Sequence, residues 1–439
     1  MTDNYVAPDA VVDVLRLLTN GPQQGVVLNS PPGAGKSTAV TYMARELARH
    51  GEQVRIVAQT NSQVDDLVDR IAATAADITV GRYTAYGYEV PATLTGRNIL
   101  IANRFPDLRE TPIVVATAAK WLDPVVTERG PFAIIDEAYQ MRSDTLLRLA
   151  GMFDRAGFVG DPGQLDPFSV VNAERWTGLT WNPLQSAVAG MLASNPDIPE
   201  RQLPHSWRLA PHTAAPVSQA FYPFAPFTSA PGQPERQMWI PTRSLGNNPA
   251  DRAIEHAAAN GWAFYQLERR HTIRTDAQAV AAVVELAVRV LERGTMLRDE
   301  RHPDGARVTA PQVAIGVAHR DQMAAIKTLL AGTAYPGIRV DTANRLQGSE
   351  YDIVIVLHPL SGRRDASTFH LECGRLCVLT SRHRHACIVV ARDGIPDLLD
   401  AHPSADPVPF NTQPRFPNGW EANHALLEHL GGHRIRAGR

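Results

Sequence analysis

A glycine-rich segment at residues 30–38 (SPPGAGKST) has the residue types and spacing of a phosphate-binding loop, or P-loop. Gly33 and Gly35 allow the backbone amides to turn inward around phosphate oxygens, and the positive end of a following helix favours the same anion. Lys36 is expected to contact the β- and γ-phosphates, and the Ser37 hydroxyl is expected to coordinate Mg²⁺. The predicted nucleotide-binding residues of the loop are Gly33, Ala34, Gly35, Lys36, Ser37 and Thr38.

The elements on either side of the loop fit this role. Residues 25–29 (GVVLN) form an apolar run typical of a strand, and the apolar residues of segment 37–50 recur on one helical face. A strand, a loop and a helix in this order are the context that a P-loop requires. Ser30 replaces the usual first glycine of the pattern G-x-x-x-x-G-K-[ST]. The alternative is a glycine-rich turn that binds nothing.

Two adjacent carboxylates follow an apolar run at residues 132–140 (FAIIDEAYQ). Asp136 is expected to hold Mg²⁺ through water, and Glu137 to orient and deprotonate the attacking water. Alone, such a pair is often a solvated strand end. Together with the P-loop it predicts a nucleoside triphosphate hydrolase, and it says nothing about the work that hydrolysis drives.

Short β-branched runs alternate with helical segments along the chain, which is typical of mostly parallel sheets covered by helices. Several runs are apolar throughout, as central parallel strands are. The predicted fold class is therefore α/β. The predicted strands are residues 25–29, 55–58, 113–116, 132–136, 158–160, 313–318, 353–357 and 387–391.

With 439 residues the chain is too long for one core, since domains usually contain roughly 100–200 residues. Its 44% of hydrophobic and 20% of charged residues are typical of a globular protein, and no apolar run approaches the ~20 residues that span a bilayer. The start MTDNYVAPDA lacks the features of a secretory signal, so we expect a cytoplasmic protein without membrane contact. The three cysteines, Cys373, Cys377 and Cys387, do not support a disulfide framework and match no zinc spacing. The net charge of -2 means that nucleic acid must bind in a local groove.

The strand rhythm lapses after residue 167, and residues 194–201 (SNPDIPER) are typical of a linker. We therefore predict a first domain at residues 1–197 and a second at residues 198–402. Residues 403–439 are predicted to be a Pro-rich C-terminal extension, either ordered or a loose tail.

Beyond the phosphate site, an ordered series of motifs resembles superfamily 1 helicases, especially the 5′-to-3′ branch that includes the nonsense-mediated-decay RNA helicase. The resemblance spans residues 26–394 and implies two tandem RecA-like domains with parallel sheets and few accessory insertions, which bind ATP and Mg²⁺. Residues 58–67 (AQTNSQVDDL) resemble motif Ia, and residues 114–117 (VVAT) resemble the next strand-end contact. In isolation both are ordinary helix caps. By resemblance, the residues that contact the nucleic-acid backbone are Thr60, Asn61, Ser62 and Thr117.

Two further segments resemble motifs that connect the nucleotide to the second domain. Residues 160–167 (GDPGQLDP) resemble motif III, G-D-x-x-Q-L-x-P, in which Gln164 would link the γ-phosphate to the nucleic-acid path. Residues 206–212 (SWRLAPH) resemble the segment that opens the second motor domain. By position, Trp207 would stack on adenine and Arg208 would reach the γ-phosphate. The alternative is a core tryptophan beside a surface arginine.

Residues 342–352 (TANRLQGSEYD) resemble motif V, T-x-x-x-x-Q-G-x-E-x-D, and precede an apolar strand. The resemblance assigns Thr342 to nucleic acid and Glu350 to the ribose or phosphates of the nucleotide. It assigns Gln347 and Gly348 to the coupling between the two ligands.

Residues 375–384 (RLCVLTSRHR) resemble motif VI, with Cys377 in place of an asparagine. This register puts Arg382 at the arginine-finger position, where a guanidinium neutralises charge on the transferred phosphoryl group. His319 and Arg320 lie near motif IV and are further candidates for nucleic-acid contact.

The resemblance thus implies an ATP-dependent translocase or helicase that moves on single-stranded nucleic acid, in the 5′-to-3′ direction. Its catalytic groups would be Glu137, Gln164, Arg208 and Arg382. DNA is favoured over RNA, although no reader of the 2′-hydroxyl is visible, and a protein partner is a candidate source of specificity. Short gaps between motifs leave little room for accessory domains, so weak unwinding is expected. The competing hypothesis is an ATP-switched nucleic-acid-binding or remodelling subunit that unwinds nothing itself.

Overall fold

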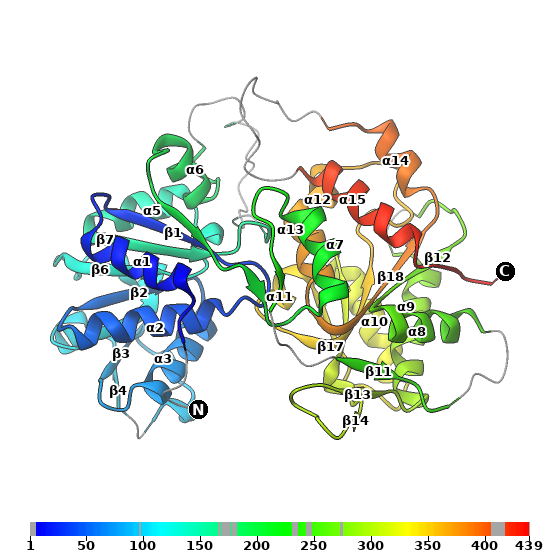
Figure 1. Ribbon diagram of the computed structural model, residues 1–439, viewed down its shortest axis with the longest axis horizontal. Helices are drawn as coiled ribbons and strands as arrows, with labels where there is room; N and C mark the ends of the chain where they lie inside the picture. The colour runs from blue at the N-terminus through cyan, green and yellow to red at the C-terminus, as the bar shows by residue number, and fades with distance from the viewer. Residues whose placement is uncertain are drawn as a thin grey trace. The chain divides into compact units, whose positions relative to one another are not determined.

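The computed structural model describes residues 6–95, 98–165, 167, 176, 182–230, 236–242, 248–272, 275–404 and 418–438. The chain divides into two compact units, one formed by Met1–Pro162 and Asp166–Leu203, the other by Gly163–Leu165 and Pro204–Arg439. Each contains a large parallel sheet flanked by helices (Figure 1), which confirms the predicted α/β class. Among the described helices, none combines the length and the apolar character needed to cross a bilayer.

The sheet of the first unit has the strand order β4-β3-β5-β2-β6-β7-β1-β8, and all its described pairings are parallel. Its strands are β1 (Gly25–Asn29), β2 (Val54–Ala58), β3 (Val80–Tyr83), β4 (Ile99–Ala102), β5 (Ile113–Thr117), β6 (Gly130–Ile135), β7 (Phe153–Gly160) and β8 (Glu200–Gln202). Its helices are α1 (Asp9–Asn20), α2 (Lys36–Arg49), α3 (Asn61–Thr74), α4 (Ala118–Trp121), α5 (Ser143–Leu149) and α6 (Ala187–Ser194).

Parallel pairing brings the carboxyl ends of these strands to one edge of the sheet. β2 is buried along its whole length between β5 and β6, and α2 buries an apolar face that includes Val40, Met43 and Leu47. Ligands of open parallel sheets bind beyond the carboxyl ends of the strands. The segments after β1, β6, β7, β2 and β5 therefore share the edge where a ligand is expected.

The main sheet of the second unit has the order β16-β15-β17-β18-β12-β19, again with parallel pairings throughout. Its strands are β12 (Trp262–Leu267), β15 (Val313–Val317), β16 (Arg339–Thr342), β17 (Tyr351–Leu357), β18 (His383–Arg392) and β19 (Arg434–Arg436). Its helices are α7 (Pro211–Phe221), α8 (Pro249–Asn260), α9 (Ala277–Glu292), α10 (Arg320–Ala331), α11 (Ala343–Leu346), α12 (Thr368–Leu371), α13 (Cys373–Thr380), α14 (Ile395–Ala401) and α15 (Gly419–Gly431).

Alternating residues of these strands are buried in two separate hydrophobic cores, one on each face of the sheet. In β18, whose ten residues are all buried, Ile388 and Val390 face a core shared with α8, α9 and α10. Cys387 and Val389 face the opposite core, which contains α7, α13 and α15. A strand buried on both faces is apolar on both, as the sequence predicted for a central parallel strand.

Smaller sheets accompany the main one. β11 (Gln237–Trp239), β13 (Met296–Arg298) and β14 (Ala306–Arg307) form an antiparallel three-stranded sheet in the order β11-β13-β14. A short parallel pair joins β9 (His205–Ser206) to β10 (Thr228–Ser229). The register of β11 against β13 pairs Gln237 with Arg298, so the residue before β11 lies near the residue after β13.

The C-terminal segment is an integral part of the second unit. α15 buries Ala422, Leu426 and Leu430 in the core with α7 and α13, and β19 pairs with β12 at the sheet edge. Residues 418–438 therefore contribute a helix and an edge strand to the second unit. Residues 405–417 lie outside the described part of the chain.

A buried histidine at the end of β17 makes the stability of the second unit sensitive to pH. His358 is 1% exposed, and its Nδ1 accepts a hydrogen bond from the amide of Leu360 at 3.1 Å. Burial lowers the pKa of His358 to about 3, whereas an unfolded histidine has a pKa of about 6.5. Protonation is therefore favoured in the unfolded chain, and the stability that His358 contributes is complete above about pH 6.5 and lost as the pH falls towards 3.

We expect His358→Asn to reduce this pH dependence, because the asparagine oxygen is able to accept the same amide hydrogen bond without titrating. Between pH 7.5 and 5.5, the unfolding free energy of the wild type should fall by about 1.4 kcal/mol more than that of the variant. Urea unfolding at the two pH values measures the difference. The same substitution at His402, an exposed histidine of this unit, should leave the pH dependence unchanged. Equal losses in wild type and His358→Asn would contradict the assignment.

Candidate nucleotide and nucleic-acid site

The P-loop lies between β1 and α2, as the sequence predicted. Gly33 and Gly35 have φ angles of 72° and 89°, in the region that favours glycine. Gly35 is the N-cap of α2 and supplies no capping side chain, so the first turn, with Lys36 and Ser37, is built to receive an anion. The backbone amide of Ser30 donates to the carbonyl of Gly160 at 2.8 Å, which fixes the start of the loop to the end of β7.

The lysine of this loop meets both predicted carboxylates. Lys36 Nζ lies 3.2 Å from Asp136 Oδ1 and forms a second ion pair with Glu137. Burial lowers the pKa of Lys36, but the two carboxylates outweigh burial and hold the pKa above its usual range. Burial is also the main cause that raises the pKa of Asp136, which Lys36 partly offsets. Three groups predicted from two distant segments therefore form one charged cluster.

Glu137 is held in an unusual backbone conformation. Its φ of 50° and ψ of 42° are left-handed, and among the described residues it is the only one other than glycine with a positive φ. Such a conformation costs an ordinary residue about 1–2 kcal/mol. The neighbouring Tyr139 fastens the segment, since its hydroxyl donates to Asn29 Oδ1 at 2.6 Å. Backbone strain of this kind concentrates at functional sites.

In the second unit the structure brings together residues from three of the predicted motifs. Arg208 Nε donates to Glu350 Oε2 at 3.3 Å, and Arg208 Nη1 donates to the carbonyl of Ser381 at 3.2 Å. Although burial favours the protonated acid, Arg208 and Arg301 hold the pKa of Glu350 at about 2. Trp207 is 57% exposed, which argues against the alternative that it is a core residue.

The predicted arginine finger is engaged within its own segment. Arg382 is 1% exposed, and its guanidinium donates to the carbonyl of Val378 at 3.2 Å and to Ser381 Oγ at 3.1 Å. It is thus next to the Ser381 carbonyl that receives Arg208. Its role in catalysis stays a prediction.

Sequence comparisons assign both units to one kind of domain. Residues 12–175 match a family model described as an AAA domain, and residues 189–393 match a second model with the same description. The chain contains two AAA domains in tandem. The two compact units are called the first and second AAA domains below.

Two solved structures that are similar to the chain are viral helicases. The helicase of PRRSV has 15% identity and a TM-score of 0.40, and the match covers 89% of this chain and 56% of that chain. Arterivirus nonstructural protein 10, a helicase whose structure was solved in complex with DNA, has 13% identity and a TM-score of 0.43, with 89% and 64% covered. The chain therefore spans less than two thirds of the length of these helicases. No curated protein matches the sequence.

In the first AAA domain, the predicted nucleic-acid residues lie at the carboxyl ends of adjacent strands. Thr60 is the N-cap of α3, Thr117 is the N-cap of α4, and β2 pairs with β5 so that Ala58 is opposite Thr117. Thr60, Asn61 and Ser62 are exposed. The two threonine oxygens accept amide hydrogen bonds as helix caps, so their structural role is established, and their contact with nucleic acid stays a prediction.

The second AAA domain repeats this arrangement. Thr342 ends β16 opposite Val317, the last residue of β15, and His319 and Arg320 begin α10 directly after β15. His319 Nε2 lies 3.0 Å from His370 Nε2, and its ring stacks on Phe369 with 5.0 Å between centroids. Arg320 is exposed. The three predicted residues therefore share one edge of the sheet.

The segment that carries Gln164 is built into the second AAA domain, although most of its sequence neighbours belong to the first. Leu165 is 3% exposed in the core that contains Tyr222 and Leu376. A Cβ atom on Gly374 would lie 2.4 Å from the carbonyl oxygen of Gln164, so this contact requires a glycine at the start of α13. Motif III thus contacts the helix that leads into motif VI.

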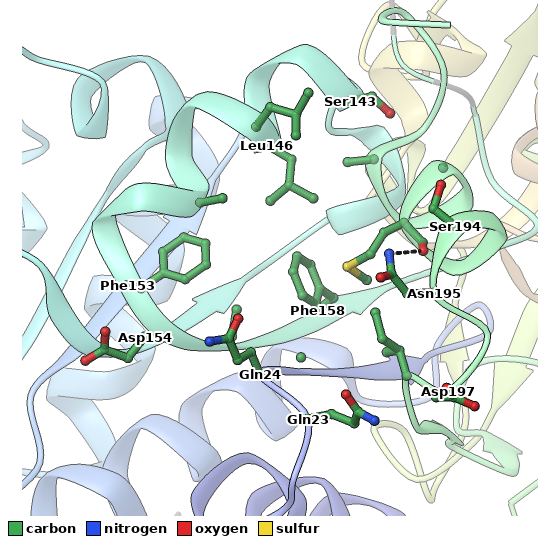
Figure 2. Close-up of a pocket in the computed structure, with 18 of the residues that line it drawn as sticks. Gln23, Gln24, Ser143, Leu146, Phe153, Asp154, Phe158, Ser194, Asn195 and Asp197 are labelled. Atoms are coloured by element: carbon green, nitrogen blue, oxygen red, sulfur yellow. Dashed lines mark hydrogen bonds between the residues drawn. The ribbon is translucent and has the colours of Figure 1, made fainter. Parts of the chain in front are cut away.

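A cavity of about 1050 Å³ in the first AAA domain is separate from the P-loop. Figure 2 shows Leu146, Phe153 and Phe158 among its lining side chains. Gly25 and Phe153, which also line it, are the first residues of β1 and β7. The cavity therefore lies at the amino ends of these strands, whereas the P-loop follows the carboxyl end of β1.

Proposed function

We propose that the chain is an ATPase of the superfamily 1 helicase type, which uses ATP hydrolysis to move along single-stranded nucleic acid. The observation that carries the proposal is the cluster of Lys36, Asp136 and Glu137 at the carboxyl edge of the first sheet. In this cluster Lys36 is a cation that would bind phosphate, and Asp136 is a buried carboxylate that would bind a metal ion. Glu137, whose backbone is strained, would activate the attacking water.

In this proposal each polar group of the cluster has a separate task. Lys36 neutralises the β- and γ-phosphates once ATP displaces its carboxylate partners, and Glu137 then accepts a proton from the attacking water. The Ser37 hydroxyl and the Asp136 carboxylate are hard oxygen donors of the kind that Mg²⁺ prefers, so they would hold it. Bound Mg²⁺ would neutralise charge on the phosphate oxygens. Arg208 and Arg382 of the second AAA domain would act on the charge of the transferred phosphoryl group.

The strand-end residues support a nucleic-acid ligand. Each AAA domain presents polar residues at the carboxyl ends of two adjacent strands, Thr60 and Thr117 in the first, His319 and Thr342 in the second. Two such sites, whose separation changes with the state of the nucleotide, are what a translocase requires. Gln164, anchored against α13, is the proposed connection between the phosphate and this motion.

The motif resemblance supports movement from 5′ to 3′. We further propose DNA rather than RNA as the strand, the cytoplasm as the location, and a partner protein as the source of specificity.

The test is ATPase activity titrated with single-stranded DNA, single-stranded RNA and duplex DNA at two salt concentrations. We expect single strands to stimulate hydrolysis, because a motor couples its two ligands. The stimulation should weaken as salt rises, since backbone contacts release counterions with a log-log slope of roughly -0.7 per neutralised phosphate. The ratio of the DNA and RNA midpoints measures the preference between them.

An ATPase that no nucleic acid stimulates, and that retains no strand in the presence of a non-hydrolysable ATP analogue, would exclude the translocase. Retention of a strand with the analogue, without any stimulation of hydrolysis, would instead favour the ATP-switched binding subunit.

A further inference from the structure

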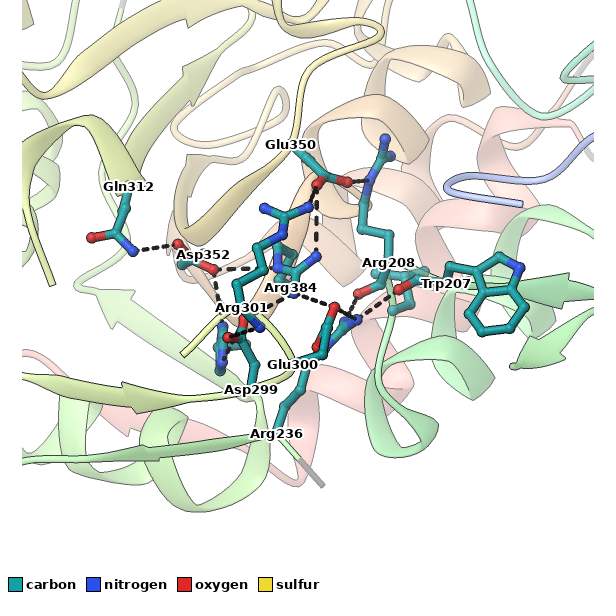
Figure 3. A network of polar contacts seen from close by, with 12 residues as sticks. Trp207, Arg208, Arg236, Asp299, Glu300, Arg301, Gln312, Glu350, Asp352 and Arg384 are labelled. Carbon is teal, nitrogen blue, oxygen red and sulfur yellow. Dashed lines mark hydrogen bonds and ion pairs between the residues drawn. The ribbon is translucent and has the colours of Figure 1, made fainter. Parts of the chain in front are cut away.

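A hairpin turn outside the predicted motifs contacts Glu350 and Arg384 of the second AAA domain. Asp299, Glu300 and Arg301 follow β13 in the small antiparallel sheet. Figure 3 shows these residues pointing into a network of charged side chains together with Arg208 and Glu350. Neither the turn nor Arg236, which precedes β11 of the same sheet, belongs to a motif that the sequence singled out.

Arg236 fixes the main chain beneath Trp207 and Arg208. Its Nη2 donates to the carbonyl of Trp207 at 2.6 Å, and its Nη1 donates to the carbonyl of Arg208. The same guanidinium forms an ion pair with Glu300 at 3.1 Å, and the Arg236 side chain is 1% exposed. A planar guanidinium is able to satisfy two carbonyls and a carboxylate at once, which a lysine ammonium does less well. The main chain that carries the exposed Trp207 ring is therefore held by a buried arginine directly before β11.

The turn also holds the residues of motifs V and VI. Arg384 Nη2 lies 2.8 Å from Asp299 Oδ2 and 2.6 Å from Glu300 Oε1, and Arg301 pairs with Glu350. Although burial favours the protonated acid, Arg384 holds the pKa of Asp299 at about 2, so this carboxylate is charged at neutral pH. Guanidinium groups and carboxylates alternate through the network, since Glu300 lies between Arg236 and Arg384, and Glu350 pairs with Arg301.

We propose that Arg236 and Glu300 are positioning residues for ATP hydrolysis, which present the Trp207 ring to the base and the Arg208 guanidinium to the phosphates. This inference rests on the proposed function. Buried ion pairs add little net stability compared with apolar residues of the same size, so a geometric role is the better account of a network this extensive. The small antiparallel sheet would then have a function. It would place Arg236 against the carbonyls of Trp207 and Arg208, and Glu300 against the side chain of Arg384.

The experiment compares Arg236→Met, Arg236→Lys and Glu300→Gln with the wild type. Because a displacement of about 1 Å at a reacting group is able to cost about 10²-fold in rate, we expect Arg236→Met to lower kcat 10- to 100-fold and to raise KM for ATP. Arg236→Lys should recover part of the loss, because it keeps the charge opposite Glu300. The matched control is Arg269→Met, which removes an exposed arginine paired with Asp397 in the same domain and should change neither parameter.

Two further readouts separate positioning from a general loss of structure. The quenching of Trp207 fluorescence by a non-hydrolysable ATP analogue, isolated by difference from Trp207→Phe, should decrease in Arg236→Met while the thermal unfolding midpoint changes little. In the double variant of Arg236→Met and Glu300→Gln, kcat/KM should be close to that of the worse single variant, because both residues act through one network.

If the wild type hydrolyses ATP and Arg236→Met has the same kcat, KM and fluorescence quenching, this inference is overturned and the proposed function is not. A lowered unfolding midpoint with unchanged kinetics would do the same, since it would mean a purely structural role. A wild type without ATPase activity would overturn the proposed function and this inference with it. If Arg236→Met does not fold, Arg236→Lys and Glu300→Gln decide the question by the same readouts.

Discussion

Lys36→Ala is expected to abolish ATP hydrolysis in a protein that still folds. Lys36 is the first residue of α2, and its ammonium group pairs with the two carboxylates that directly follow β6. Removal of one preorganised charged donor from a phosphoryl-transfer site costs about 10²–10³-fold or more in turnover. Here the loss is compounded, because without the lysine Asp136 and Glu137 repel the phosphates of ATP. Both kcat and ATP affinity should therefore fall.

The measurement is phosphate release at saturating ATP, with circular dichroism to verify the fold. Lys327→Ala is the matched control, because Lys327 is an exposed lysine on α10 of the second AAA domain. Full activity of folded Lys36→Ala would show that the loop at residues 30–38 does not bind the transferred phosphate.

Glu137→Gln is expected to separate ATP binding from ATP hydrolysis. Glutamine has the same size as glutamate, and the left-handed backbone conformation at position 137 costs the two residues a similar conformational energy. Unlike glutamate, glutamine does not accept a proton from water. Loss of a general base typically lowers turnover by about 10²–10⁴-fold. Binding should persist, because Lys36 and the loop amides remain and one negative charge near the phosphates is removed.

Equilibrium binding of a fluorescent ATP analogue and steady-state turnover, measured on the same preparation, test this separation. Glu128→Gln changes a half-exposed glutamate of the first AAA domain that pairs with Arg109, and it should leave both values unaltered. Normal turnover in Glu137→Gln would assign the base elsewhere, with Asp136 as the next candidate.

Much of the fold was predictable because its determinants are local. Each of the predicted strands corresponds to a strand in the structure, since apolar β-branched runs and central parallel strands coincide. Several strands were not predicted, and one of them, β12 (Trp262–Leu267), has the sequence WAFYQL, in which aromatic residues and a glutamine replace the β-branched run. The helix α15 was hidden by the Pro-rich residues that precede it, although Leu426 and Leu430 belong to its apolar face.

The position of the P-loop between a strand and a helix was predictable for a similar reason, whereas the charged network of the second AAA domain was not. A P-loop and a carboxylate pair are short patterns whose chemistry is local in sequence. By contrast, Asp299, Glu300 and Arg301 lie in the sequence DERHPDG, which is typical of a solvated turn. The role that we propose for them depends on contacts with Arg236, Glu350 and Arg384, which are distant in the chain. Only tertiary structure reveals such a network.

The burial of Leu165 means that the second compact unit is discontinuous in sequence, because it includes Gly163–Leu165 as well as the chain from Pro204 onward. The core of this unit is complete only when Leu165 packs against residues that begin at Leu209. Folding must therefore close a loop formed by the chain between these two positions. A fully buried leucine contributes about 2 kcal/mol, which helps to offset that closure. A fragment that begins at residue 198 or 204 would lack this side chain and expose the apolar surface that it covers. No single truncation point therefore separates the two compact units. Motif III contributes core residues to the second unit, in addition to its proposed role in sensing the phosphate.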